Sequence, residues 1–146
     1  MSYNEINLGE RRMVLLAPLT IGAAVGATAT TPVTDMGGMN YLVVTGVFLY
    51  GAGGTDAIAR VQTSVDGGLS WIDIVALGFL TAASTKVSAV TTGIAPGSQA
   101  SVYTDGTMTV NTVLQGVLGD RIRVKYVTTG TYTGATSLAV YAIAKD

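Results

Sequence analysis

Short runs of Val, Ile, Thr and Tyr alternate with Gly, Asp and Ser along most of the chain. This pattern is typical of an all-β domain, because strands favour β-branched and aromatic residues and turns favour small breakers. No long window repeats apolar residues at i, i+3 and i+4, so no helix is predicted. We expect about nine strands, at residues 12–17, 31–35, 41–50, 57–65, 71–77, 85–91, 107–115, 121–128 and 137–144.

The clearest local feature is a strand, a turn and a second strand over residues 57–77. The turn contains Asp66-Gly67, two residue types that tolerate the positive φ of the favoured hairpin turns. We therefore predict a β-hairpin there. Residues 41–50 are apolar on both faces, which predicts a central strand. A second hairpin is expected around the Gly-bearing loop 129–134, and a long loop over residues 94–106.

These strands predict an antiparallel, jelly-roll-like β-sandwich, formed as a single domain by residues 12–146. A length of 146 residues suits one domain. Residues 1–11 are polar and have no core-forming pattern, so we expect an extended N-terminal arm that lies along another subunit. Periodicity does not report strand order, and an immunoglobulin-like connectivity stays open.

Charge is scarce in this chain, and this scarcity points to contact surfaces. Only 12% of the residues are charged, about half the usual fraction, and 49% are hydrophobic. A fold with so few charges is expected to expose large neutral patches, which usually mark interfaces. The eight Lys and Arg residues are spread along a chain of net charge −1, so no nucleic-acid partner is predicted. Residues 13–27 are apolar but interrupted, and neither a secretory signal nor a membrane span is expected.

The side-chain chemistry of the chain is equally sparse. There is no His and no Cys, which removes the commonest general base and the commonest zinc ligands. We therefore predict no enzymatic activity, no metal site and no cofactor. A glycosidase requires two carboxyl groups, one on either side of the bond that it cleaves. Asp66 and Asp73 are the only carboxylates close in sequence within the central hairpin. Asp73 alternates with two Ile residues, however, and is expected to face solvent.

Three other acidic residues and one Gly-rich segment have simpler explanations than ligand binding. Acidic side chains next to Gly in turns can hold calcium, but no EF-hand spacing is present and turn chemistry suffices. These residues are Asp56, Asp105 and Asp120. Residues 51–55 lack the Gly-Lys-Thr/Ser ending of a phosphate-binding loop, so a plain connection between strands is predicted.

Residues 64–71 match the pattern S-x-D-x-G-x-S-W, known as the Asp box. Its defining positions are Ser64, Asp66, Gly68, Ser70 and Trp71. The pattern resembles the surface hairpin found in each blade of sialidase-type propellers, where it is not catalytic. A propeller needs at least four such blades, and this chain has one box. We interpret the box as a folding device in which Asp66 accepts turn N–H groups and Trp71 covers the hairpin, with ligand binding as the alternative.

The strand at residues 121–127 has the cleanest alternation in the chain. Arg121, Arg123 and Lys125 are predicted to share one face, opposite an apolar face. This basic face is either solvated or an inter-subunit contact with neighbouring carboxylates. Arg11, at the end of the predicted arm, and the adjoining Arg12 carry the same two alternatives. These five residues are our candidate assembly contacts.

Three stretches of the chain resemble a known family. Residues 61–74, together with Gly119-Asp120-Arg121-Ile122-Arg123-Val124-Lys125 and Thr129-Gly130-Thr131-Tyr132, are similar to small β-sandwich virion proteins of tailed bacteriophages. The resemblance is greatest to head decoration (cement) or minor capsid proteins, and it covers roughly residues 40–145. It implies a jelly-roll-like fold and a symmetric homo-oligomer, often a trimer. It also implies attachment to the major capsid protein on the virion surface after synthesis in the host cytoplasm, with no cofactor.

Two alternatives to capsid decoration stay open. One is another virion position, such as the neck, the tail or a fibre base. The other is a non-catalytic carbohydrate-binding β-sandwich module, which needs exposed aromatic side chains. Tyr103 and Tyr132, both expected in loops, are its candidates.

Overall fold

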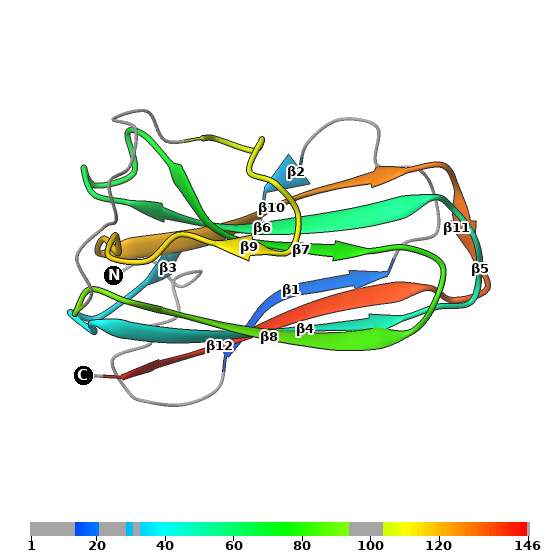
Figure 1. Cartoon of the computed structure of the whole chain (residues 1–146), viewed down its shortest axis with the longest axis horizontal. Helices are drawn as coiled ribbons and strands as arrows, with labels where there is room; N and C mark the ends of the chain where they lie inside the picture. Colours follow the sequence, from blue (N-terminus) through cyan, green and yellow to red (C-terminus); the bar gives the residue numbers. More distant parts are fainter. Residues whose placement is uncertain (1–13, 21–28, 31–32, 94–103, 146) are drawn as a thin grey trace.

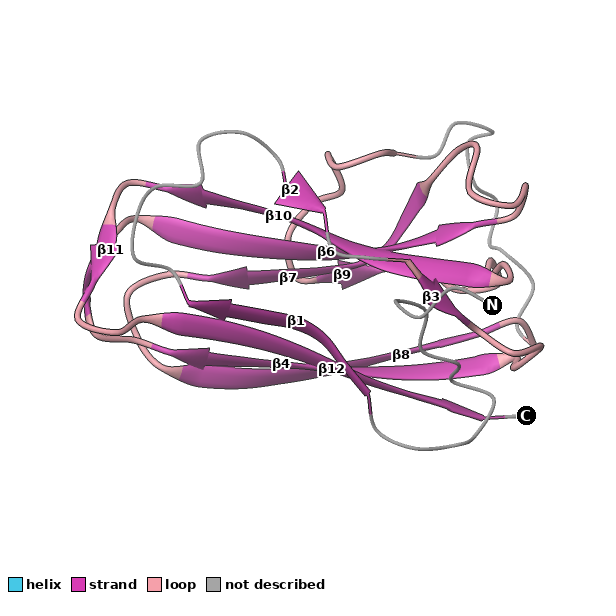
Figure 2. Cartoon of the chain, turned by 180° about the vertical axis from the view of Figure 1, so that it is seen from behind, coloured by secondary structure: helices cyan, strands magenta, loops and turns pink. Residues whose placement is uncertain are grey.

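Two facing β-sheets make up the described part of the chain (Figure 1). The computed structural model describes residues 33–93 and 104–145 in full, and residues 14–20 and 29–30 by their backbone. Among these residues there are twelve strands. Figure 2 shows strands and loops but no helix in this part of the chain. All pairings are antiparallel. The predicted all-β sandwich is therefore confirmed, while the jelly-roll connectivity stays a prediction.

The two sheets are built mainly from seven long strands. The four-stranded sheet has the order β1 (Val14–Thr20), β12 (Ser137–Lys145), β4 (Tyr41–Leu49) and β8 (Ser84–Thr91). The six-stranded sheet has the order β2 (Ala29–Thr30), β10 (Arg121–Thr129), β6 (Asp56–Ser64), β7 (Ile72–Phe79) and β9 (Thr112–Val113), with β3 (Thr34–Asp35) also paired to β10. A third pair, β5 (Ala52–Gly53) and β11 (Tyr132–Thr133), lies at one end of the sandwich.

Most connections between the long strands cross from one sheet to the other. There are two exceptions: β1 and β4 both belong to the four-stranded sheet, and the predicted central hairpin is confirmed as β6 paired with β7. The second predicted hairpin is wrong, because β10 and β12 belong to opposite sheets. The loop at 129–134 instead carries β11 across the end of the sandwich, where it pairs with β5. The sequence predicts a turn there, but a turn motif does not determine to which sheet the next strand belongs.

The core between the sheets follows the strand alternation. In β4 and β12, every second residue is buried, and the same pattern opens β10. The largest buried side chains include Phe48, Phe79 and Tyr132. The Phe48 ring lies 5.2 Å from the Phe79 ring and 5.7 Å from the Tyr132 ring, measured between centroids. Aromatic rings at such distances add stabilisation beyond their buried area.

Tyr132 closes the end of the sandwich. It is fully buried, and its hydroxyl donates a hydrogen bond of 2.8 Å to the backbone oxygen of Leu80. Burial raises its pKa above the ordinary value. A Cβ on Gly54 would lie 2.4 Å from the Tyr132 ring, and Gly54 has a φ of +68°. Only glycine suits both conditions, so the Gly-rich segment at 51–55 serves the packing of this corner.

Two further predictions need correction. The strand expected at 107–115 is reduced to Thr112–Val113, because residues 104–108 are bonded to a side chain on β7 and leave the ladder. The positive φ values of the central turn fall on Gly67 and Gly68 and not on Asp66-Gly67. The expected arm at 1–11, with Arg11 and Arg12, lies outside the described residues, as does most of the loop expected at 94–106.

Replacing Phe48 should test the aromatic core. Phe48→Ala removes a fully buried ring that contacts two others. The free energy of unfolding should fall by about 3–5 kcal/mol, measured by denaturant titration. Leu49→Ala, the next residue on the strand and 57% exposed, is the matched control and should change stability by less than about 0.5 kcal/mol. Equal losses in the two variants would contradict the described packing.

Candidate interaction surfaces

The Asp-box residues form a compact hydrogen-bonded turn between β6 and β7. The hydroxyl of Ser64 donates to Asp66 Oδ1 at 2.8 Å and accepts the backbone N–H of Gly68 at 2.7 Å. Asp66 also accepts the N–H and the hydroxyl of Ser70, at 2.9 and 2.5 Å. The predicted role of Asp66 as an acceptor for turn N–H groups is therefore confirmed. Bonds from Ser70 and then Ser64 lower the pKa of Asp66 to about 2.

Trp71 lies beside this turn and beneath an arginine. The Arg123 guanidinium lies 4.3 Å from the centroid of the Trp71 ring, close enough for a cation–π contact. Arg123 Nε also donates to Gln62 Oε1 at 2.8 Å. Burial lowers the pKa of Arg123 from its ordinary value. Trp71 thus links the turn to β10, and its ring is half-buried.

Asp73 organises the outer side of the six-stranded sheet. Its side chain is 1% exposed, so the expectation that it faces solvent is wrong. It points outward from β7, but residues 104–108 cover it. Its carboxyl oxygens accept hydrogen bonds of 2.7–3.0 Å from Gln62 Nε2, Thr104 Oγ1 and the backbone N–H groups of Gly106, Thr107 and Met108. Five donors from two segments converge on one side chain, which holds the 104–108 loop against the sheet.

The predicted basic face lies on the same side of this sheet, and its charges are engaged within the chain. Lys125 pairs with Asp105 at 2.9 Å, and Arg121 lies 3.8 Å from Asp120. Burial alone would raise the pKa of Asp105. Hydrogen bonds from Lys125 and Gln62, and the charges of Lys125 and Arg123, bring it below the ordinary value. A role of these cations as assembly contacts stays a prediction, and Asp105 and Asp120 are explained by their place in turns.

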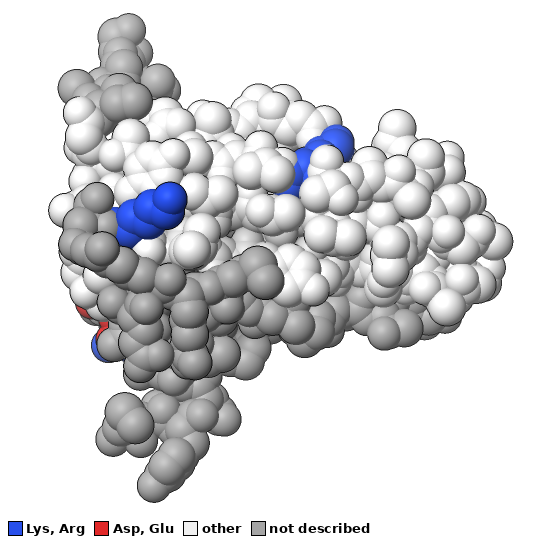
Figure 3. Space-filling model, turned by 90° about the horizontal axis from the view of Figure 1, so that it is seen from below, with Lys and Arg blue, Asp and Glu red and all other residues white. Residues whose placement is uncertain are grey.

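The outer face of the four-stranded sheet is different in kind. Alternation and register give β4, β12 and β8 a common outward set with one charged residue, Lys145, at the far end of β12. The set is Tyr41, Val43, Thr45, Val47, Leu49, Ser137, Ala139, Tyr141, Ile143, Lys145, Thr85, Val87, Ala89 and Thr91. Figure 3 views this side, and the part of the surface that is not grey is largely uncharged, with two separate basic patches. A solvated sheet face normally alternates to polar residues, so this face has the composition of a contact surface.

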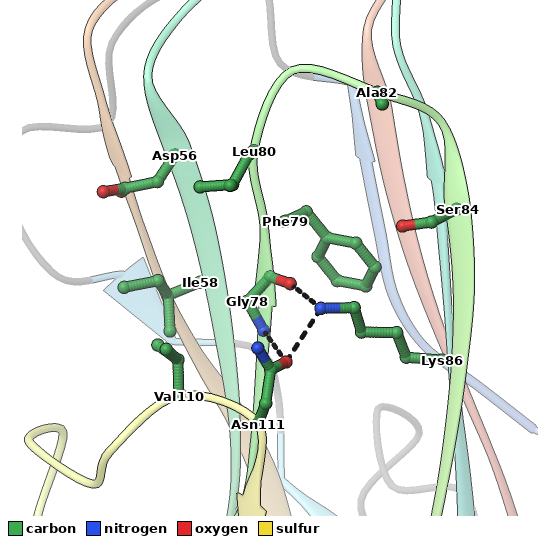
Figure 4. Close-up of a pocket in the computed structure, with 10 residues that line it drawn as sticks. All are labelled: Asp56, Ile58, Gly78, Phe79, Leu80, Ala82, Ser84, Lys86, Val110 and Asn111. Atoms are coloured by element: carbon green, nitrogen blue, oxygen red, sulfur yellow. Dashed lines mark hydrogen bonds between the residues drawn. The ribbon is translucent and has the colours of Figure 1, made fainter.

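A groove runs along the edge where β7 and β8 face each other (Figure 4). It contains two neighbouring hollows of about 440 and 390 Å³ that share Lys86 and Asn111. Lys86 extends from β8 across the groove and donates to Gly78 O and to Asn111 Oδ1, the latter at 2.8 Å. Its ammonium also lies 5.2 Å from the centroid of the Phe79 ring. The side chains that line the larger hollow are mainly apolar.

The sequence predicts the Asp-box turn but not the groove. Lys86 is visible in the sequence as a single cation on an otherwise neutral strand, yet nothing local connects it to Asn111. Asn111 has a φ of +61°, a conformation that Asn tolerates better than most residues. Tyr132, a candidate for a carbohydrate platform, is buried in the core, and Tyr103 lies outside the described residues.

The described residues contain no group of three or more acidic, His or Cys side chains placed to hold a metal ion. None of their elements is a helix long and apolar enough to cross a membrane. No protein-family model, curated protein or solved structure matches the chain.

The pKa of Asp66 makes the turn sensitive to acid. A carboxyl whose pKa is lowered on folding stabilises the fold above its unfolded value, here 3.8, and this contribution is lost as the pH falls through about 2. The melting temperature of the wild type should therefore exceed that of Asp66→Asn at pH 6, and the gap should narrow by pH 2. Ser70→Ala should move the NMR-monitored Asp66 titration upward. A gap that does not depend on pH would contradict the bonding described.

Asp73→Asn should release the 104–108 loop. The substituted amide nitrogen cannot accept the N–H groups that converge there, so the loss of stability should be about 3 kcal/mol. Amide hydrogen exchange at Gly106, Thr107 and Met108 should accelerate more than exchange in β4. Asp105→Asn is the control, because Asp105 is exposed and accepts only two of the bonds in this region. Unchanged protection of the loop in Asp73→Asn would show that Asp73 does not hold it.

Proposed function

We propose that this chain is a structural virion protein that decorates a bacteriophage capsid and stabilises it by bridging capsid subunits as a symmetric oligomer. The observation that supports the proposal best is the nearly uncharged outer face formed by β4, β8 and β12. A free-standing sandwich gains nothing from such a face, whereas a component of a shell buries it. The chain-wide shortage of charge agrees with a protein that works inside an assembly.

The face is large enough to contribute much of an interface. Its three strands β4, β8 and β12, spaced about 4.8 Å apart and eight or nine residues long at about 3.3 Å per residue, present roughly 400 Å². Stable interfaces bury about 800 Å² per partner, so this face supplies about half of one. A partner that binds only the assembled shell stabilises it by mass action, and many copies add their contributions. Decoration therefore needs no chemistry at the surface, only a complementary neutral patch.

The neck, the tail and the fibre base are alternative positions on the particle, because the same face would serve there. Immunogold electron microscopy of particles whose genome encodes the chain separates these positions. Gold over the head favours decoration, and gold confined to one vertex or to the tail favours the alternatives. A carbohydrate-binding module would leave particles unlabelled and give binding on a glycan array.

A pair of matched leucine substitutions tests whether the face carries the binding. Leu49→Glu places a charge at the end of the outer face, and Leu69→Glu places one on the Asp-box turn, where the side chain is 88% exposed. Purified Leu49→Glu should lose at least about tenfold in affinity for undecorated heads, since an unpaired charge in an interface costs more than about 1.4 kcal/mol. Leu69→Glu should bind like the wild type. Equal binding by both variants would remove the face from the proposal.

Removal of residues 1–11 is the companion experiment. The truncated chain should keep its β-sheet circular dichroism and its cooperative melting, because the described sheets do not include these residues. It should fail to bind heads if the arm contributes as we expect. A truncated protein that still decorates would overturn the arm while leaving the role of the sheet face to the leucine pair.

A further inference from the structure

In the part of the chain that the structure describes, one stretch of β8 has backbone groups without a partner strand. β8 is the outer strand of its sheet and, among the described residues, pairs only with β4. On its outer edge, Gln115 bonds to the N–H of Thr91 and to the oxygen of Ala89. Backbone groups of alternate residues point to the same edge of a strand, so those of Thr85 and Val87 also point outward. No hydrogen bond from the described residues reaches them there.

The neighbouring edge groups are closed by side chains and by one backbone N–H. On β7, Asn111 Oδ1 accepts the N–H of Gly78 at 3.2 Å, and Lys86 donates to the Gly78 oxygen. On β8, Gly116 donates to the oxygen of Thr91 at 2.9 Å. Among the described residues, the outer edge of β8 is therefore capped at Ala89–Thr91 and open at Thr85–Val87. Exposed strand edges of this kind accept an added strand from another chain.

The two hollows lie next to this gap. Val87 and Lys86 both line the smaller hollow, and Lys86 and Ser84 line the larger one. The surroundings are apolar and open: Leu80 is 67% exposed and Val87 is 65% exposed. In strand addition, backbone bonds supply affinity and pockets for alternate side chains supply specificity. This edge provides both.

We propose that the β8 edge and its groove bind residues 4–10 of a second copy of this chain as an added strand. The segment reads Asn4-Glu5-Ile6-Asn7-Leu8-Gly9-Glu10. Ile6 and Leu8 are two residues apart, so a strand would place both on the same side, one for each hollow. Glu10 lies on this same side and complements Lys86, which has three N–H donors and uses two within the chain.

The connection between residues 10 and 14 is too short for the added strand to come from the same molecule. β1 begins at Val14 on the opposite edge of the sheet from β8, so a strand added to β8 lies four strand spacings from β1. At about 4.8 Å each, that is about 19 Å even in a straight line through the sheet. From Glu10 to Val14 the chain covers four residue steps, at most about 14 Å. A segment paired up to Glu10 therefore cannot come from the same molecule.

This arrangement gives each copy one donor segment and one acceptor edge on opposite sides of the sheet. Contacts between unlike surfaces close into rings, or into a reciprocal exchange between two copies. The inference deepens the proposed function and rests on its claim that the chain works as an oligomer. The contact between copies then lies at the β8 edge, and the uncharged sheet face is left for the shell.

Two full-length variants and their mixture test the proposal by light scattering. Val87→Pro removes the outward N–H and blocks the acceptor, while no bond to β4 is lost because that N–H faces away from β4. Ile6→Asn combined with Leu8→Asn disables the donor. The wild type should scatter as a closed oligomer, and each variant alone should have the 14.9 kDa mass of one chain. An equimolar mixture should show about twice that mass, because one intact donor then meets one intact acceptor.

Val87→Thr keeps the N–H and the branched side chain, and it should retain the wild-type mass. If Val87→Pro does not fold, as judged by circular dichroism, Thr85→Pro tests the same edge. The proposal would be overturned by a wild-type monomer, by an oligomer that persists in Val87→Pro or in the Ile6→Asn, Leu8→Asn double variant, or by a mixture of these two that stays monomeric. An oligomer that persists in both variants but is lost in Leu49→Glu would assign the contact between copies to the sheet face. Immunogold labelling reports separately on the proposed function, so the two can fail independently.

Discussion

The buried carboxyl group of Asp73 is the constraint on which one side of the molecule depends. It collects N–H donors from residues 106–108 and so holds an irregular segment flat on the six-stranded sheet. Burying a carboxyl group is costly unless its oxygens are hydrogen-bonded, and here the loop backbone and Gln62 provide those bonds. The held loop leads directly to Asn111, which caps the edge of β7 and contacts Lys86. A polar contact on the outer face of one sheet thus shapes the groove at the edge of the sandwich.

The two outer faces of the sandwich divide the polar groups unequally. The six-stranded sheet carries the Arg123–Trp71 contact and the Lys125–Asp105 pair. The four-stranded sheet carries one charged residue on the outer side of β4, β8 and β12. Surface ion pairs contribute little to the free energy of unfolding. The role of the charged groups is therefore to position the neighbouring loops and to keep this face of the sheet solvated. The neutral face has almost no charged groups, so a partner that covers it removes few charges from water.

The sequence predicts the positions of strands and turns, which depend on local patterns. It does not predict which strands share a sheet or which loops cover a strand. The strand expected at 85–91 lies at Ser84–Thr91, and the strand expected at 137–144 lies at Ser137–Lys145. Period-two alternation and turn residues are sufficient for such elements. Asp73 was misplaced because alternation reports which side of a strand a residue faces, not whether a loop distant in sequence covers that side. The false hairpin at 129–134 has the same origin, since the choice between sheets is made by core packing around Tyr132.

The way in which this chain protects its strand edges indicates that the gap on β8 has a use. Edge strands invite uncontrolled pairing, and proteins protect them with inward-facing charges, side-chain caps and covering loops. This chain uses all three along one edge: Lys86 in the groove, Gln115 and Asn111 as caps, and the segment around Gly116 as a cover. Among the described residues, this protection does not extend to Thr85 and Val87, whose outward N–H and C=O groups lie beside the two hollows. A strand pairs well with this open stretch only if its side chains also fit the hollows, so pairing at this edge becomes selective.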